Sequence, residues 1–306
     1  MQINIYYKYA RSALKVGLRA IKIHKGILLP NYICASVPAV IKDLNIPIYY
    51  YNINEKFEPA LGQIEQIIRV NEVDGILGVH YFGQPFNIPE YLKVCSKYSL
   101  KLIEDNAHGF GGIGFGGELG KHGSIGISSP RKFINTYGGG VLHINNSYRV
   151  NLEQEYSKKT VNSVFYNLLQ RLPNIRKNLK KIKRKKQNWN NKNLYIDEKL
   201  GGEYIDIDSY NVILRQNWVN ISKIRIENWC ILVDKYRNIA NPVWAKPERK
   251  SNPWACPFIF RNKTERNKFL DRVTSDGYEA FTWPYIGPTN PKNSLWEKIA
   301  CINLDL

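Results

Sequence analysis

The chain has 306 residues, 43% hydrophobic content and a net charge of +18. This length can bury the core of one large domain or two, and no apolar run approaches the roughly 20 residues of a membrane-spanning helix. The N-terminal residues lack the unbroken apolar segment of a signal peptide, so we expect a cytoplasmic protein. The five cysteines are scattered without C-x-x-C spacing, which favours free thiols over a disulfide framework or a zinc site.

Helical and extended patterns alternate through the first half of the chain. The spacing of apolar residues predicts helices over residues 9–23, 34–44, 58–70 and 89–100. Short apolar runs predict strands over residues 26–30, 46–53, 75–83 and 101–105. This alternation is typical of a largely parallel sheet with helices on both faces.

The second half of the chain changes in pattern. We predict two further strands over 123–129 and 138–145. Helices are predicted over 157–172, 216–240 and 263–276, and apolar extended segments over 254–260 and 278–284. The predicted fold class is therefore α/β. We expect a large domain over 1–215, followed over 216–306 by a long linking helix and a smaller α+β C-terminal domain.

A basic insertion at about 171–192 (RLPNIRKNLKKIKRKKQNWNNK) contains no acidic residue. Such a stretch suits a polyanion, and contact of residues 176–186 with an acidic membrane surface is one interpretation. A solvated, Lys-rich loop is an equally good one. No nucleic-acid motif accompanies the charge, so we expect no specific nucleic-acid partner.

Polar side chains gather where predicted strands end. Asp105 and His108 follow one strand in IEDNAHG, and Lys132 follows another together with Ser128–Ser129. Ser12 stands at the start of a helix, where free N–H groups and the dipole favour a phosphate. A lysine, an acid and a phosphate-binding helix terminus together form the set that pyridoxal 5'-phosphate requires.

Three segments carry a family resemblance. GVHYFGQPFNI, LIEDNAHGFGGIGFGGELGKHGSIGISSPRKF and TYGGGVLHIN reproduce, over residues 78–145, the motif order of one family. The chain thus resembles the DegT/DnrJ/EryC1/StrS family of PLP-dependent sugar aminotransferases. The resemblance implies the PLP-dependent transferase fold of type I and a homodimer.

The resemblance also implies roles for single residues. Lys132 would form the Schiff base with the cofactor and carry protons once released. Asp105 would face the pyridine nitrogen, and His108 the ring hydroxyl. Phosphate contacts would come from Ser12 and Ala13 through their backbone N–H groups and from Ser128 or Ser129, between which the sequence does not decide.

Residues near these positions are interpreted either as supporting the site or as purely structural. His80 and Gln84 would support the site beneath the strand ends, and Glu104 is interpreted as structural. Cys34 falls where relatives place the aromatic residue that stacks on the cofactor, and Tyr32 could substitute for it.

The chain departs from the family pattern in other places. Relatives carry an acid at the position of Gly138 and extend further ahead of the phosphate-binding turn. Their G-x-N-Y-R-like segment is not recognisable, and residues 205–218 occupy its place.

The resemblance implies transfer of an amino group from glutamate to a ketosugar linked to a nucleotide diphosphate. Such products enter O-antigen, capsule or glycan biosynthesis. A PLP-dependent sugar dehydratase is an alternative, although those relatives replace the lysine with histidine. A non-catalytic binding protein is another, against which the joint presence of Lys132, Asp105 and His108 weighs.

Overall fold

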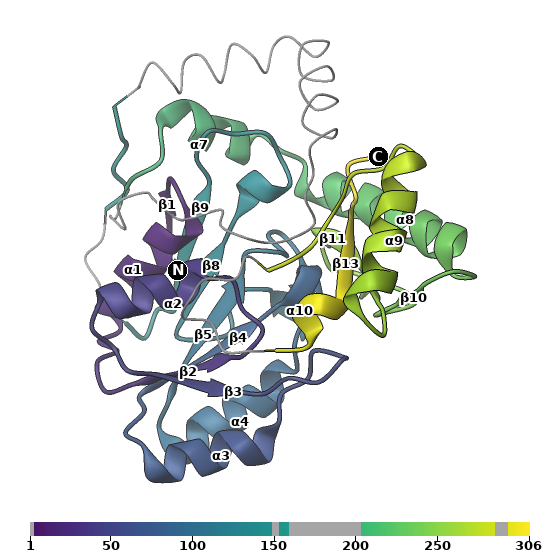
Figure 1. Ribbon diagram of the computed structural model, residues 1–306. Coiled ribbons are helices and arrows are strands. Elements are labelled where there is room, and N and C mark those ends of the chain that lie inside the picture. Colours follow the sequence, from purple (N-terminus) through teal and green to yellow (C-terminus); the bar gives the residue numbers. More distant parts are fainter. Residues whose placement is uncertain (1–2, 149–152, 159–202, 285–292) are drawn as a thin grey trace.

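A computed structural model describes residues 3–148, 153–158, 203–284 and 293–306 (Figure 1). The basic insertion and nearly all of the helix predicted over 157–172 lie outside these ranges. Ser157, at the start of that prediction, instead forms an isolated bridge with Asp206. Every helix in the described ranges is too short or too polar to cross a bilayer.

A seven-stranded sheet forms the centre of the molecule (Figure 1), in the order β1-β9-β8-β5-β4-β2-β3. The strands from β8 to β3 run parallel, whereas β9 runs antiparallel between β8 and β1. This confirms the prediction of a largely parallel sheet. In chain order the strands are β1 (Ile3–Tyr7), β2 (Ile27–Pro30), β3 (Ile48–Tyr51), β4 (Gly75–Val79), β5 (Lys101–Asn106), β8 (Ile125–Ser128) and β9 (Gly140–Ile144).

Helices cover both faces of this sheet. The face under α1 (Ala10–Ala20) and α2 (Ser36–Asp43) forms one core, and the face under α3 (Leu61–Val70) and α4 (Ile88–Tyr98) forms another. Neighbouring residues of β2 divide between them, because Leu29 belongs to the first core and Leu28 to the second. Burial on both faces explains why the strand is apolar throughout.

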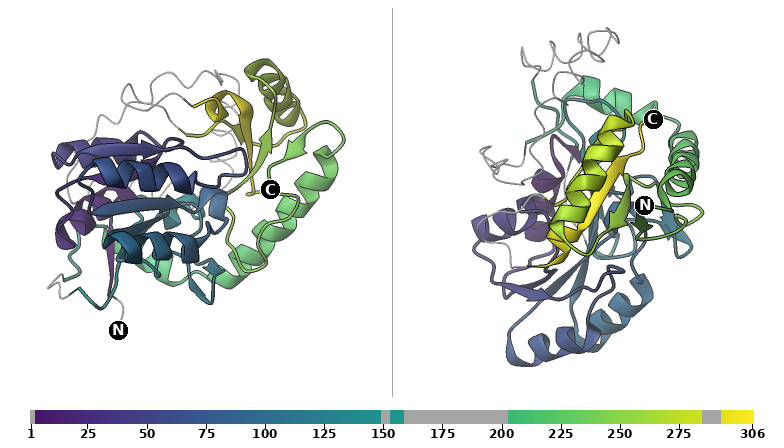
Figure 2. Two further views of the ribbon diagram at one scale, coloured as in Figure 1. Left: turned by 90° about the horizontal axis from the view of Figure 1, so that it is seen from below. Right: turned by 45° about the vertical axis from the view of Figure 1, so that its right-hand side comes forward.

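A smaller antiparallel sheet lies beside the large one, with its helices on its outer side (Figure 2). Phe258 on one face packs with residues of the helices at 218–236 and 263–275. Ala255 and Cys301 on the other face join the core of the large sheet. The small sheet therefore lies between its own helices and the large sheet. Its elements are α8 (Trp218–Tyr236), β10 (Asn241–Pro242), β11 (Ala255–Ile259), α9 (Lys263–Ser275), β12 (Ala280–Phe281), α10 (Leu295–Lys298) and β13 (Ile299–Asn303).

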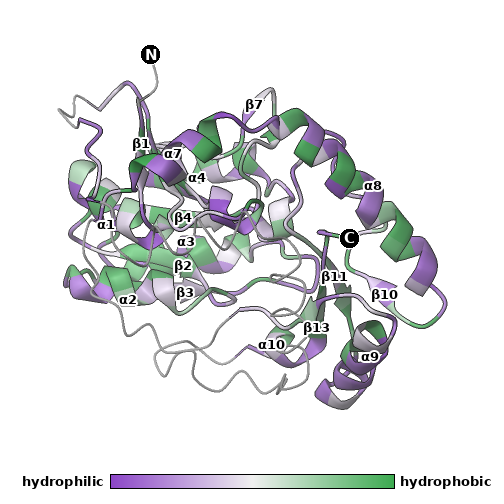
Figure 3. Ribbon diagram, turned by 90° about the horizontal axis from the view of Figure 1, so that it is seen from above, coloured by the Kyte–Doolittle hydropathy of each residue, from purple (hydrophilic) through white to green (hydrophobic). Residues whose placement is uncertain are grey.

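Most predicted elements are present, with ends that shift by a few residues. Strands β1 and β13 were not predicted, nor was α7 (Ile207–Leu214), which lies within the segment that replaces the family's G-x-N-Y-R region. Helix α9 is largely hydrophilic in Figure 3, in keeping with its single buried face. The division into domains at residue 215 stays a prediction.

Candidate active site

The parallel strands β4, β5 and β8 end at the same edge of the large sheet. Val79, Asp105 and Ile127 are register partners across these strands, so the residues that follow them meet. Lys132 follows β8 in the short 3₁₀ turn η2 (Pro130–Lys132), whose first residue is a proline suited to a helix start. The carboxyl end of such a sheet is where α/β proteins bind ligands.

Lys132 is a half-buried residue whose amine lies among other side chains. Burial lowers the pKa of Lys132 to about 8; the nearby Cys34 thiol and Asp105 carboxylate oppose this shift, and the charge of Arg131 adds to it. The Nζ atom lies 4.3 Å from the ring centroid of Trp254. About a tenth of the amine is then uncharged at pH 7, far more than for an ordinary lysine, and the uncharged amine is the nucleophilic form.

Asp105 is 8% exposed, and one of its oxygens accepts a hydrogen bond from the backbone N–H of Ala107 (3.0 Å). Burial raises the pKa of Asp105, against the hydrogen bond from Ala107 and the charges of Lys132 and His80. A cationic group bound beside this carboxylate would stabilise its ionised form. The chemistry of the residue therefore suits a protonated ring nitrogen.

His108 is buried between two aromatic rings, at centroid distances of 4.3 Å from Trp254 and 5.8 Å from Phe82. Its Nδ1 accepts a hydrogen bond from the backbone N–H of Phe82 (3.3 Å). Burial lowers the pKa of His108, and the charge of Lys132 lowers it further. The network thus assigns the neutral tautomer with hydrogen on Nε2, a donor suited to a ring oxygen.

The two candidate serines differ in their surroundings. The Ser128 hydroxyl lies 3.1 Å from Nε2 of His143 and accepts from the side-chain amide of Asn106 (3.3 Å). The other ring nitrogen of His143 contacts Asn4 Oδ1 (2.8 Å). Ser128 is therefore part of a buried network, whereas Ser129 stands in the turn that leads to Lys132.

Helix α1 begins beside this turn, at Ala10. The backbone N–H groups of Ser12 and Ala13 both donate to the carbonyl of Tyr9, at 3.1 and 3.2 Å. That these amides contact a phosphate stays a prediction. The buried Ser12 hydroxyl and the helix dipole remain available for such a role.

Cys34 and Tyr32 have separate environments. The Cys34 thiol is half-buried, lies within range of the Lys132 charge and accepts a hydrogen bond from Ser36 (3.3 Å). Tyr32 is fully buried, packs against Trp283 and donates its hydroxyl to the backbone carbonyl of Trp283. Tyr32 thus belongs to the core and does not substitute for a stacking residue.

Glu104 organises the glycine-rich loop behind the site. Its carboxylate accepts backbone hydrogen bonds from Gly120, His122 and Gly123 at 2.6–3.0 Å, and it contacts Nε2 of His80 at 3.0 Å. These contacts agree with a structural role for Glu104. They also place His80 beneath the strand ends, as the sequence led us to expect.

The segment of residues 248–254, which we call the strap, crosses the site and was not identified from the sequence. Gln84 joins it to the large sheet, because its side-chain oxygen accepts from the backbone N–H of Glu248 (2.7 Å). The strap ends at Trp254, which contacts both Lys132 and His108. A tryptophan at the start of a strand is an ordinary core pattern, so the sequence held no signal for this position.

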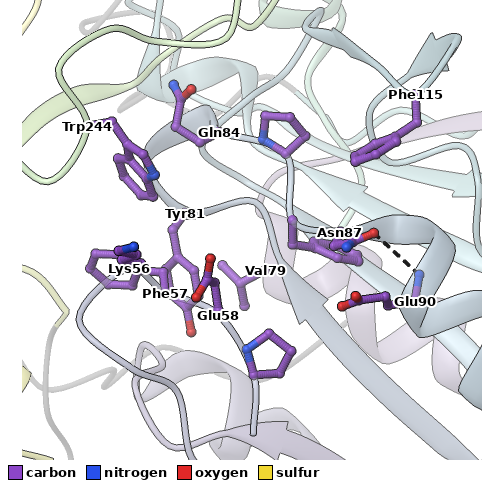
Figure 4. A pocket seen from close by; sticks show the side chains of 13 residues that line it. Lys56, Phe57, Glu58, Val79, Tyr81, Gln84, Asn87, Glu90, Phe115 and Trp244 are labelled. Atoms are coloured by element: carbon purple, nitrogen blue, oxygen red, sulfur yellow. Dashed lines mark hydrogen bonds between the residues drawn. The ribbon is translucent and has the colours of Figure 1, made fainter. Parts of the chain in front are cut away.

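A cavity of about 520 Å³ opens on the other side of Gln84 (Figure 4). Phe57, Tyr81, Phe115 and Trp244 provide aromatic walls, and Glu58 beside Phe57 and Glu90 beside Asn87 add two carboxylates to the lining. Lys132, Asp105 and His108 do not line it. The cavity is therefore separate from the lysine site.

We compared the chain with models of known protein families. Residues 5–171, more than half of the chain, match the model of the DegT/DnrJ/EryC1/StrS aminotransferase family. The chain belongs to this family. Sequence resemblance to its members, stated above, is thereby confirmed.

Two curated relatives show how far the similarity extends. GDP-perosamine synthase of Escherichia coli O157:H7 is 32% identical over 139 residues, which are 44% of this chain and 38% of that protein. A UDP-N-acetyl-3-dehydro-alpha-D-glucosamine 3-aminotransferase of Acidithiobacillus ferrooxidans is 26% identical over 133 residues, 42% of this chain and 36% of that protein. The chain thus matches less than two fifths of the length of these relatives.

Solved structures support the fold over the whole chain. PseC of Helicobacter pylori, an aminotransferase of pseudaminic acid biosynthesis, has a TM-score of 0.70 at 15% identity, covering 99% of this chain and 82% of that one. The PLP form of the putative sugar aminotransferase Spr1654 from Streptococcus pneumoniae has a TM-score of 0.66 at 15% identity, covering 98% and 81%. The expected fold of PLP-dependent transferases is confirmed.

The cofactor of this family is pyridoxal 5'-phosphate. The donor set described above fits it: a partly uncharged buried amine, a carboxylate that a cation would stabilise and a neutral histidine that can donate from Nε2. The family and the geometry therefore agree on the chemical nature of the ligand.

Proposed function

We propose that this chain is a PLP-dependent aminotransferase that transfers an amino group to a nucleotide-linked ketosugar. The observation that carries the proposal is the Lys132 amine, enclosed beside Asp105 and His108 with a pKa lowered by burial to about 8. A binding protein has no need of an activated lysine in such surroundings. The similarity to sugar aminotransferases supports the substrate class.

The cofactor, when bound, supplies an electron sink that makes a proton on the amine-bearing substrate carbon acidic. In our proposal Lys132 would hold the cofactor covalently and, once free, would move that proton, a step for which an amine pKa near ambient pH is suited. Asp105 would hold the ring nitrogen protonated, and Nε2 of His108 would donate a hydrogen bond to the cofactor. Ser129, the Ser12 hydroxyl and the start of α1 bind the phosphate.

Glutamate as amino donor, a homodimeric assembly and a place in O-antigen, capsule or glycan biosynthesis belong to the same proposal. The names of the relatives support the nucleotide-sugar class. A cytoplasmic location and the membrane contact of residues 176–186 stay predictions.

The test is reduction of the protein with borohydride after incubation with PLP, followed by peptide mapping. We expect the phosphopyridoxyl mass on Lys132, its loss in Lys132→Ala, and its retention in Lys56→Ala, which changes an exposed lysine. Glutamate should then bleach the Schiff-base absorption of the wild type. A label on another lysine would overturn the site, and a label on Lys132 without any response to amino donors would overturn the transaminase.

A further inference from the structure

The amine of Lys132 lies over the indole ring of Trp254. The Nζ atom lies 4.3 Å from the ring centroid, within the range of a cation–π interaction. The same indole stacks on the imidazole of His108 at 4.3 Å with an interplanar angle of 28°. One side chain thus joins the lysine and the histidine.

The backbone of Trp254 is fixed at both ends. Its N–H donates to the carbonyl of Phe82 (3.1 Å), and its carbonyl accepts from Nη2 of Arg225 (2.7 Å). Arg225 is 3% exposed, and its Nε also donates to the carbonyl of Pro253 (2.8 Å). The same guanidinium forms a salt bridge with the carboxylate of Asp305, so Arg225 is fully partnered and ties residues 253 and 254 to helix α8.

The remainder of the strap is held as firmly. The Asn252 side chain donates to the carbonyl of Phe110 (2.6 Å), and the carbonyl of Ser251 accepts from the hydroxyl of Ser222 (2.6 Å). The strap passes so close to Gly83 that a Cβ there would lie 2.5 Å from the carbonyl oxygen of Asn252. Gly83 also has a φ of +87°, so glycine is required on both counts.

Arg225 reaches the lysine turn as well as the strap. Its guanidinium carbon lies 5.1 Å above the ring of Phe133, the neighbour of Lys132 in the chain. One arginine of α8 therefore braces both the segment that carries Trp254 and the segment that carries Lys132. The distance between the amine and the indole is thus set by a shared, buried support.

We propose that Trp254 is a positioning residue for Lys132, whose indole face holds the amine of the lysine near His108 whenever it is free of the cofactor. The inference rests on the proposed function of Lys132. In that function the amine must leave the cofactor, carry a proton and return, and a fixed resting place keeps it within reach. The indole also favours the cationic amine, against the burial that favours the neutral one.

Other groups face the same amine and must be held constant in a test. They are the Asp105 carboxylate, the Cys34 thiol, the Arg131 guanidinium and the His108 imidazole. Replacing Trp254 alone leaves all four in place, so a change in the titration of Lys132 can be assigned to the loss of the indole face.

The experiment measures the rate at which trace acetic anhydride modifies Lys132 in the cofactor-free protein as a function of pH, by mass spectrometry. We expect Trp254→Leu to raise the fraction of uncharged amine, and hence the rate at pH 7, about two- to five-fold. Trp254→Phe retains an aromatic face and should change it less. Trp244→Leu, at a half-buried tryptophan of the same C-terminal unit, should leave it unchanged.

An unchanged or lower rate in Trp254→Leu, or an equal change in Trp244→Leu, would overturn the inference. The Phe variant keeps the test decisive if the Leu variant does not fold, because a rise in rate of about five-fold at pH 7 with an aromatic ring still in place would contradict a cation–π contact. Borohydride labelling of the same proteins separates the two proposals. Failure of PLP to attach to Lys132 in the wild type would refute the proposed function, whereas the titration alone decides the role of Trp254.

Discussion

Ser128 and Ser129 are adjacent in the chain, yet their replacement should have opposite consequences. We expect Ser128→Ala to lower stability with little effect on cofactor affinity, and Ser129→Ala to lower cofactor affinity with little effect on stability. The reason is that the Ser128 hydroxyl lies between His143 and Asn106 in a buried network, while Ser129 belongs to the lysine turn.

The loss of stability expected in Ser128→Ala follows from the hydrogen-bond partners that would lose the hydroxyl. Burial lowers the pKa of His143 to about 3, so the ring is neutral, and with its Nδ1 hydrogen donated to Asn4 its Nε2 needs a donor. Without Ser128 this nitrogen is buried and unsatisfied, which costs about 1–3 kcal/mol. Asn106 loses less, since its amide also donates to the carbonyl of Leu119 (2.8 Å). At about 2–4 °C per kcal/mol, the melting temperature should fall by roughly 2–12 °C.

The loss of cofactor affinity expected in Ser129→Ala follows from the removal of a hydrogen bond to a charged phosphate, which contributes about 1.5–3 kcal/mol. Its loss should weaken the affinity for PLP by roughly 10- to 150-fold. Both variants can be compared by thermal unfolding without cofactor and by absorbance titration with PLP. The reverse pattern, with unchanged unfolding but lost affinity in Ser128→Ala, would refute the assignment of the two serines.

Two further predictions concern buried carboxylates. Burial alone would raise the pKa of Glu104, but hydrogen bonds from His122, His80 and Gly123 lower it well below its usual value. The ionised carboxylate therefore stabilises the fold above pH 4.5, and this stability is lost as the pH falls below that value. Glu104→Gln should therefore lower the melting temperature at neutral pH and flatten its acid dependence; parallel acid limbs in variant and wild type would contradict this. Gly138→Asp should destabilise the fold by about 1–3 kcal/mol more than Gly138→Ala, because the new carboxylate would meet the buried carboxylate of Asp206. Denaturant unfolding measures the difference, and equal losses in both variants would contradict the charge argument.

The sequence predicted the features that depend on local pattern. The alternation of apolar helices and strands predicted the parallel strands of the large sheet and the helices between them along the chain, and IEDNAHG predicted Asp105 and His108 at a strand end. Strand β1 was missed because its partner β9 lies far along the chain, and only that antiparallel pairing identifies it as a strand. Trp254 was missed for the same reason, since its role follows from the course of the strap across Gly83.

The departure from the family pattern at Gly138 shows how such distant contacts change the meaning of a motif. Gly138 lies where relatives carry an acid, yet a Cβ at this position would lie 3.5 Å from an oxygen of Asp206. Asp206 is the N-cap of α7, and this oxygen has no hydrogen-bond partner among the described residues. The hydroxyl of Ser209, in the same helix, accepts from the backbone N–H of Gly138 (3.1 Å). Helix α7 thus brings a carboxylate to the turn from another part of the chain, a contact that the motif around Gly138 alone does not reveal.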